Sequence, residues 1–191
     1  MTLPNKLTIL RIILSPLFLL FFFMDTILPV PSLAVVSVLI VLFAVIELTD
    51  LLDGYFARKL NQTSDLGKVL DPFADSFSRL TYFLCFTLIG LMPVWVFVLV
   101  LYRDLGVSFI RLLMAKRGIV MPARLSGKIK AVIYAAAGFA GVAFFFFLKS
   151  GFVPGIIVPA RVIVEVFFYA AGGVAVWSFI DYALSLKIEK T

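Results

Sequence analysis

The chain has 191 residues, of which 63% are hydrophobic and 15% are charged, and its mean hydropathy is +1.13. This composition excludes an ordinary soluble domain and is typical of integral membrane proteins. Histidine is absent and Cys85 is the single cysteine, which excludes Ser-His-Asp triads, histidine-containing zinc motifs and an intrachain disulfide.

Six apolar segments are long enough to cross a bilayer, which takes about 20 helical residues. In chain order they are residues 7–24, 33–53, 71–91, 92–114, 129–149 and 162–184. The first has no small-residue cleavage site behind it, so we expect a retained span and not a signal peptide. The sequence therefore predicts an all-α integral membrane protein, a six-transmembrane-helix bundle that forms one domain over residues 1–191.

Lysine and arginine gather at alternate ends of these spans. They precede the first span, separate the second from the third and the fourth from the fifth, and follow the sixth. By the positive-inside rule, both termini and the connection after the second span face the cytoplasm. The net charge of +6 then reflects a basic face against anionic headgroups, and it gives no reason to expect a nucleic-acid partner.

Four carboxylates stand out in residues 50–75, DLLDGYFARKLNQTSDLGKVLDPFAD. Asp50 and Asp53 end the second span, while Asp71 and Asp75 begin the third, where Asp71 before Pro72 is a good N-cap. Spacings of three and four residues put each pair on one helix face, and antiparallel packing of the two spans brings both pairs to one depth. Because ionised groups there need a counter-charge, we predict a cytosolic-side site for Mg²⁺ or Mn²⁺, with two ions per site.

The pattern Asp50-x2-Asp53-Gly54-x2-Ala57-Arg58-x8-Gly67-x3-Asp71-x3-Asp75 is similar to the signature of the CDP-alcohol phosphatidyltransferase family. The resemblance implies a six-span membrane enzyme, usually a homodimer, that moves a phosphatidyl or similar group from a CDP-linked lipid to an alcohol and releases CMP. It implies that Asp50, Asp53, Asp71 and Asp75 hold the metals and that Asp75 is the general base. The residues that it assigns to the CDP-lipid are Asn5, Thr8, Gly54, Ala57, Arg58, Ser64 and Gly67.

Three further segments resemble phosphatidylglycerophosphate synthases, a branch of that family: residues 4–11 (PNKLTILR), 103–111 (RDLGVSFIR) and 126–130 (SGKIK). This resemblance implies CDP-diacylglycerol and glycerol 3-phosphate as substrates. The acceptor phosphate is dianionic and suits charge-assisted contacts from Arg103, Arg111, Lys128 and Lys130. One position departs from the branch, which usually has lysine directly after the last aspartate, where this chain has Ser76; Arg79 shares a face with Asp75 and can supply that charge.

Other interpretations remain open at this point. The acceptor can be a different alcohol, such as an inositol phosphate, serine or another polyol, and Lys128 and Lys130 can simply flank a membrane entry. A divalent cation transporter is a hypothesis of another class, disfavoured because permeation requires polar groups through the depth of the bilayer. We expect a multi-pass protein of the bacterial inner membrane, with the lipid bilayer and a second copy of the chain as partners.

Overall fold

The computed structural model describes residues 2–59, 65–116, 124–151 and 154–188, and within these ranges every regular element is a helix. The all-α part of the prediction is therefore confirmed. The helices are α1 (Leu3–Phe22), α2 (Met24–Ile27), α3 (Ser32–Lys59), α4 (Asp65–Leu88), α5 (Val94–Lys116), α6 (Leu125–Ser150) and α7 (Pro154–Ile188).

Proline and glycine mark several of the helix boundaries. Pro31 and Pro93 directly precede α3 and α5, where a missing backbone N–H is harmless. Gly90 and Gly151 follow α4 and α6 with φ of 70° and 66°, a left-handed conformation that glycine adopts without steric penalty. These residues turn the chain sharply, so that consecutive long helices run back along one another.

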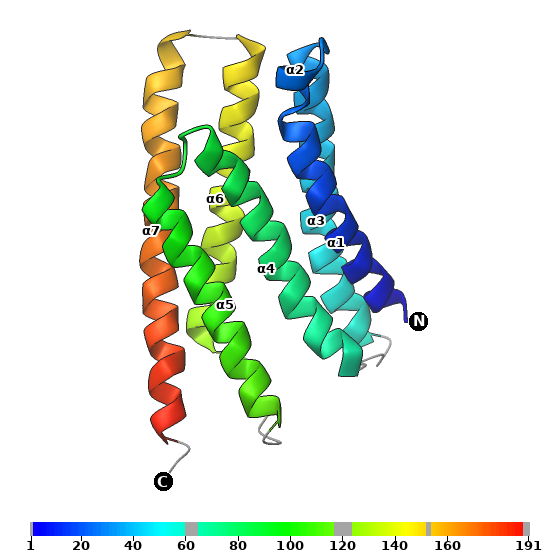
Figure 1. Ribbon diagram of the computed structural model, residues 1–191, viewed down its shortest axis with the longest axis vertical. Helices are drawn as coiled ribbons and strands as arrows, with labels where there is room; N and C mark the ends of the chain where they lie inside the picture. The colour runs from blue at the N-terminus through cyan, green and yellow to red at the C-terminus, as the bar shows by residue number, and fades with distance from the viewer. Residues whose placement is uncertain (1, 60–64, 117–123, 152–153, 189–191) are drawn as a thin grey trace.

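The long helices form one bundle in which both chain termini lie at the same end (Figure 1). Helix α1 packs against α3 and α4, α7 packs against α5 and α6, and α4 contacts α5 and α6. Helices α3 and α4 run antiparallel, as the sequence predicts (Figure 1). Helix α1 packs against both of them, which the sequence did not predict. The end that holds the termini thus gathers the last turns of α3, α5 and α7 with the first turns of α1, α4 and α6.

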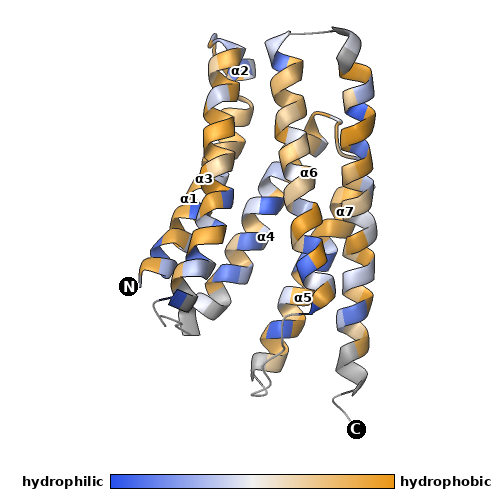
Figure 2. Cartoon of the chain, turned by 180° about the vertical axis from the view of Figure 1, so that it is seen from behind, coloured by the Kyte–Doolittle hydropathy of each residue, from blue (hydrophilic) through white to orange (hydrophobic). Residues whose placement is uncertain are grey.

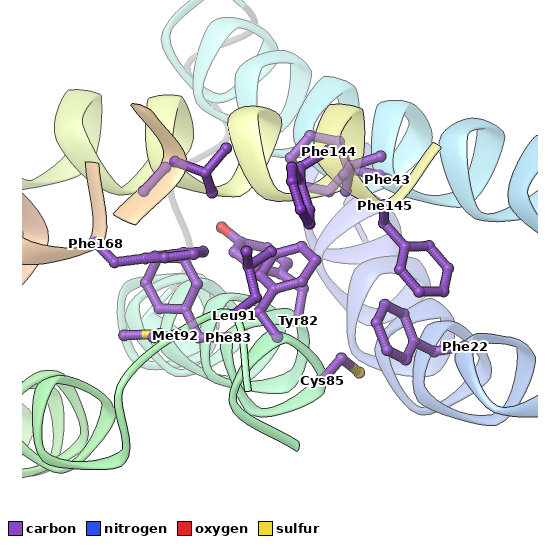
Figure 3. Close-up of a cluster of buried hydrophobic side chains, with 14 of the residues drawn as sticks. Phe22, Phe43, Tyr82, Phe83, Cys85, Leu91, Met92, Phe144, Phe145 and Phe168 are labelled. Carbon is purple, nitrogen blue, oxygen red and sulfur yellow. The ribbon is translucent and has the colours of Figure 1, made fainter. Parts of the chain in front are cut away.

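Aromatic side chains fill the middle of the bundle (Figure 3). Phe22 of α1 stacks on Phe145 of α6 with ring centroids 4.3 Å apart, and Phe83 of α4 meets Phe168 of α7 edge to face at 5.9 Å. Such aromatic pairs add about 0.5–1.5 kcal/mol beyond their buried area. Cys85 is buried in the same cluster, where its side chain packs among the aromatic rings.

Among the residues that the structure describes, four segments are long and apolar enough to cross a membrane: Leu3–Ile27, Ser32–Phe56, Leu125–Ser150 and Ile157–Leu184. Helices α4 and α5 are 24 and 23 residues long, but charged residues interrupt their apolar character. Hydrophilic residues of the bundle concentrate toward the end that holds the termini (Figure 2). The same charges that lower the hydropathy of α4 and α5 build the candidate site.

Two predicted boundaries next to the aspartates are wrong. Helix α3 runs on to Lys59, so Gly54 lies inside the helix and does not follow it. Helix α4 begins at Asp65, which puts Asp71 well inside it and not at an N-cap, with Pro72 also inside the helix. Pro72 removes one backbone hydrogen bond from α4, but a helix that starts earlier gains the backbone hydrogen bonds of residues 65–71. A single proline is therefore a weak signal for a helix start.

Candidate active site

All four aspartates of the predicted cluster lie at the end of the bundle that holds the termini, two on α3 and two on α4. Asp53 is buried, whereas the side chains of Asp50 and Asp75 are 29% and 32% exposed. The arrangement agrees with the predicted convergence at one depth. It leaves Asp50 and Asp75 on the more open side of the cluster and Asp53 on its closed side.

The side chain of Arg11, from α1, joins three of these aspartates. Its Nη1 donates to Asp50 Oδ1 and lies 3.5 Å from Asp75 Oδ1, and its Nη2 donates to Asp53 Oδ2 at 2.9 Å. Arg11 is 1% exposed, so these carboxylates are the counter-charges of a guanidinium that has left water. The sequence placed Arg11 in a resemblance motif but did not predict this position.

Two more side chains complete the cluster. Thr8, also on α1, donates to Asp71 Oδ1 at 2.8 Å and lies 3.4 Å from Asp53 Oδ2. Arg79 Nη2 is 3.4 Å from Asp75 Oδ1 and 3.5 Å from Asp50 Oδ2. The predicted pairing of Arg79 with Asp75 on one helix face is confirmed, and Arg79 also reaches across to α3.

Glu47 lies one turn before Asp50 on α3, and the sequence suggested no role for it. The hydroxyl of Tyr82 on α4 donates to Glu47 Oε1 at 3.3 Å. This hydrogen bond links α3 and α4 at the border between the polar cluster and the aromatic core, since Tyr82 also packs edge to face on Phe43.

The donor chemistry of the cluster fits a hard divalent cation. Four carboxylates face two guanidinium groups, those of Arg11 and Arg79, so the ionised cluster keeps two uncompensated negative charges. Among the residues that the structure describes, however, no three acidic side chains are arranged closely enough to hold an ion. In this structure the spacing of the carboxylates is set by Arg11, which lies between them.

The residues assigned to the CDP-lipid are distributed around this cluster. Gly54 follows Asp53 inside α3, Gly67 is buried near the start of α4, and Asn5 is buried in the first turns of α1. Ala57 and Arg58 belong to α3, but their side chains are outside the described part of the structure, as is the whole of Ser64. The described members therefore come from α3 and α4, which carry the aspartates, and from α1, which carries Arg11.

A second polar cluster lies between α5, α6 and α7. Asp104 Oδ1 accepts from Arg103 Nη1 at 2.8 Å and from Lys130 Nζ at 2.9 Å, and Arg103 Nε donates to Ser178 Oγ at 2.8 Å. These four side chains are buried. The predicted pairing of Arg103 with Asp104 is confirmed, and Lys130 joins the same carboxylate from the neighbouring helix.

The structure separates the other two predicted acceptor residues. Arg111 Nη2 donates to the hydroxyl of Tyr182 at 2.5 Å, and the ring of Tyr182 lies under the guanidinium groups of Arg111 and Arg103 at 5.2 and 5.8 Å. Lys128, in contrast, is exposed, although it lies only two residues from Lys130. Three of the four predicted residues thus gather in one place.

Helix α7 contributes residues that the sequence did not predict. Ser178 and Tyr182 contact the arginines of α5, and Asp181 accepts a hydrogen bond from Ser126 and pairs with Arg124 at 3.0 Å, at the start of α6. The available signal was their polarity within an apolar segment, because polar side chains inside a membrane span need partners.

The two polar clusters are adjacent. They lie on helices that contact each other, since α4 carries Asp75 and Arg79 and α6 carries Lys130. A ligand that spans both clusters would meet carboxylates on one side and fixed cationic groups on the other. This arrangement suits the transfer of a group between two anionic substrates.

Comparison with known proteins defines the class. A family model described as CDP-alcohol phosphatidyltransferase matches residues 1–179. The chain belongs to the CDP-alcohol phosphatidyltransferase family, and the resemblance seen in the aspartate motif is confirmed.

Bacterial relatives carry a more specific name. Proteins named CDP-diacylglycerol–glycerol-3-phosphate 3-phosphatidyltransferase are 44% identical over 104 residues in Treponema pallidum, 36% over 138 residues in Bacillus subtilis and 39% over 132 residues in Aquifex aeolicus. The alignments cover 54%, 67% and 67% of this chain. They span 47% of the Treponema protein and 69% and 68% of the other two.

Proposed function

We propose that the protein transfers a phosphatidyl group from CDP-diacylglycerol to glycerol 3-phosphate, forming phosphatidylglycerol phosphate and releasing CMP. The observation that carries the proposal is the convergence of Asp50, Asp53, Asp71 and Asp75 at one end of the bundle, in a chain of this family. The names of the relatives support the choice of both substrates.

The four aspartates would hold Mg²⁺ or Mn²⁺, two ions per site, which would neutralise the pyrophosphate of the CDP-lipid. Asn5, Thr8, Gly54, Ala57, Arg58, Ser64 and Gly67 would line the nucleotide site. The absence of side-chain carbon at Gly54 leaves room for a ligand beside Asp53.

A residue of the chain itself would remove the proton from the acceptor alcohol. Asp75, on the open side of the cluster, would accept the proton of the acceptor hydroxyl. The freed oxygen then bonds to the phosphorus that bears diacylglycerol, the bond from this phosphorus to the bridging oxygen breaks, and CMP leaves with that oxygen. No histidine exists in the chain to take this role.

The acceptor phosphate would bind at the second cluster, where Arg103, Arg111 and Lys130 provide fixed positive charge. Lys128 is the weaker candidate because its side chain is exposed. Lys130 and Asp75 lie on α6 and α4, two helices that contact each other, so an acceptor bound at Lys130 would extend toward the proposed base.

The finer architecture belongs to the same proposal. Helices α4 and α5 would complete a six-span bundle, their charges protected by the neighbouring helices, and the polar end of the bundle would face the cytoplasm by the positive-inside rule. The protein would act as a homodimer in a bacterial inner membrane, in line with the bacterial origin of the relatives.

Two alternatives can be tested against this proposal. A different acceptor, such as an inositol phosphate, serine or another polyol, would use the same carboxylates but different residues to bind the acceptor. A cation transporter is disfavoured, because hydrophobic side chains, among them Phe22, Phe83 and Phe86, fill the middle of the described bundle.

The test is an assay of the full-length protein in nanodiscs with labelled CDP-diacylglycerol, Mg²⁺ and one alcohol at a time. We expect release of CMP and formation of phosphatidylglycerol phosphate with glycerol 3-phosphate, and no comparable release with inositol phosphate or serine. Release of CMP only with another alcohol would change the acceptor. Cation flux into liposomes without any CMP release would favour the transporter.

A further inference from the structure

Arg11 occupies the place between the carboxylates that a shared cation would need. Its Nη1 contacts Asp50 and Asp75, and its Nη2 contacts Asp53. No three acidic groups in the described ranges are otherwise close enough to hold an ion. The guanidinium and a divalent cation therefore compete for the same oxygens.

We infer that Arg11 is the internal counter-ion of the cation site, and that a divalent cation binds by replacing Arg11 Nη1 between Asp50 and Asp75. This inference rests on the proposed function for the presence of the cation. It goes further by giving Arg11 a role toward the cation and by naming the contacts that are exchanged.

Exposure decides which contacts are exchanged. Asp50 and Asp75 are about one third exposed and lie on the open side of the cluster, whereas Asp53 is 5% exposed and accepts from Arg11 Nη2 at 2.9 Å. An arriving cation meets Asp50 and Asp75 first. Arg11 can then keep Asp53 as its counter-charge, so the buried guanidinium is never left unpaired.

The balance of charge explains why the exchange is possible. Arg79 Nη2 also contacts Asp50 and Asp75, at 3.5 and 3.4 Å, so these two carboxylates stay partly compensated while Nη1 leaves. With both guanidinium groups in place the four ionised carboxylates still carry two excess negative charges. The first of the two proposed divalent cations balances this excess, which gives it an electrostatic reason to enter.

The test measures binding of Mn²⁺ to the full-length protein in detergent without substrate, from the electron paramagnetic resonance signal of free Mn²⁺. We expect Arg11→Gln to bind Mn²⁺ about tenfold more tightly than the unmodified protein, and Arg11→Lys to lie between them. Lys6→Gln is the matched control, because it removes one positive charge from an exposed position on the same helix and should leave the affinity within twofold. Unchanged or weaker binding in Arg11→Gln, or no Mn²⁺ binding in any variant, would overturn the inference.

Thermal unfolding provides the second measurement. Without metal, Arg11→Gln should unfold at a lower temperature than the unmodified protein, and saturating Mn²⁺ should raise its Tm by more than it raises that of the unmodified protein. An equal or smaller rise would contradict the exchange. CMP release from CDP-diacylglycerol by the unmodified protein is measured in parallel. If no CMP is released but the variants bind Mn²⁺ as expected, the proposed function is refuted and the inference about Arg11 is not.

Discussion

The hydroxyl of Thr8 on α1 donates a 2.8 Å hydrogen bond to Asp71 Oδ1 on α4, across 63 positions of sequence. Together with Arg11, three residues further along the same helix, this contact makes the N-terminal helix part of the carboxylate cluster. The first helix therefore orients the acidic side chains of its neighbours.

Replacing Thr8 with valine tests this orientation. Valine keeps the shape of the side chain but cannot donate, and a hydrogen bond to a charged group contributes about 1.5–3 kcal/mol. We expect CMP release to fall about tenfold, with Thr8→Ser retaining most of the activity. Thr87→Val is the control, since the hydroxyl of Thr87 bonds only to the backbone of its own helix, at Phe83 O. Equal activities of Thr8→Val and the unmodified protein would show that Asp71 does not depend on this bond.

Asp75→Asn tests the proposed base. The amide retains the size of the carboxylate but cannot accept the proton, so kcat should fall by about 10²–10⁴. Because the other aspartates remain, we expect the KM for CDP-diacylglycerol to change much less than kcat. A rise in this KM with an unchanged kcat would instead assign Asp75 to substrate binding alone.

The parts of the site that could be predicted from sequence are those in which spacing along one helix fixes the geometry. Asp50 and Asp53, or Asp75 and Arg79, share a face because three or four residues make about one helical turn. Their predicted depth depended only on the order and direction of the spans. Both properties are local, so the boundaries of α3 and α4 could be wrong without moving the aspartates to another end of the bundle.

The parts that could not be predicted depend on lateral packing of helices. Nothing in the spacing of α1 indicates that Arg11 points at α3 and α4, or that Tyr182 of α7 lies beneath two arginines of α5. Such contacts depend on which helix faces which. Lys128 and Lys130 illustrate the same limit, because two basic residues of one motif end in different environments.

The contrast between Lys130 and Lys128 gives a third prediction. Lys130 is buried against Asp104, whereas Lys128 is exposed. Comparing the two positions therefore distinguishes the effect of a positive charge held in place from that of a charge surrounded by solvent. We expect Lys130→Gln to raise the KM for glycerol 3-phosphate by about tenfold or more, and Lys128→Gln to raise it far less. The KM for CDP-diacylglycerol serves as the internal reference in both variants. A larger effect at Lys128 would put the acceptor phosphate at the surface.

The fourth prediction concerns the packing that holds α4 in register with α6. A Cβ added at Gly141 of α6 would lie 2.5 Å from Phe86 Cε2 of α4, well inside van der Waals contact. Phe86 is buried among Phe22, Tyr82 and Phe168, so it cannot swing aside without disturbing the aromatic core.

Gly141→Ala should therefore destabilise the protein by about 1–3 kcal/mol, measured as a lower Tm in detergent. Gly173→Ala on α7 is the matched control, because its Cβ would meet no atom within 4 Å. Alanine is also the better helix former, by about 1 kcal/mol, so this control should be neutral or slightly stabilising.

Because α4 carries Asp71 and Asp75 while α6 carries Lys130, a shift between the two helices also changes the distance between the carboxylates and the acceptor site. CMP release should accordingly fall in Gly141→Ala even below its unfolding temperature, and full activity with an unchanged Tm would show that α4 and α6 can separate at this point without consequence for the site.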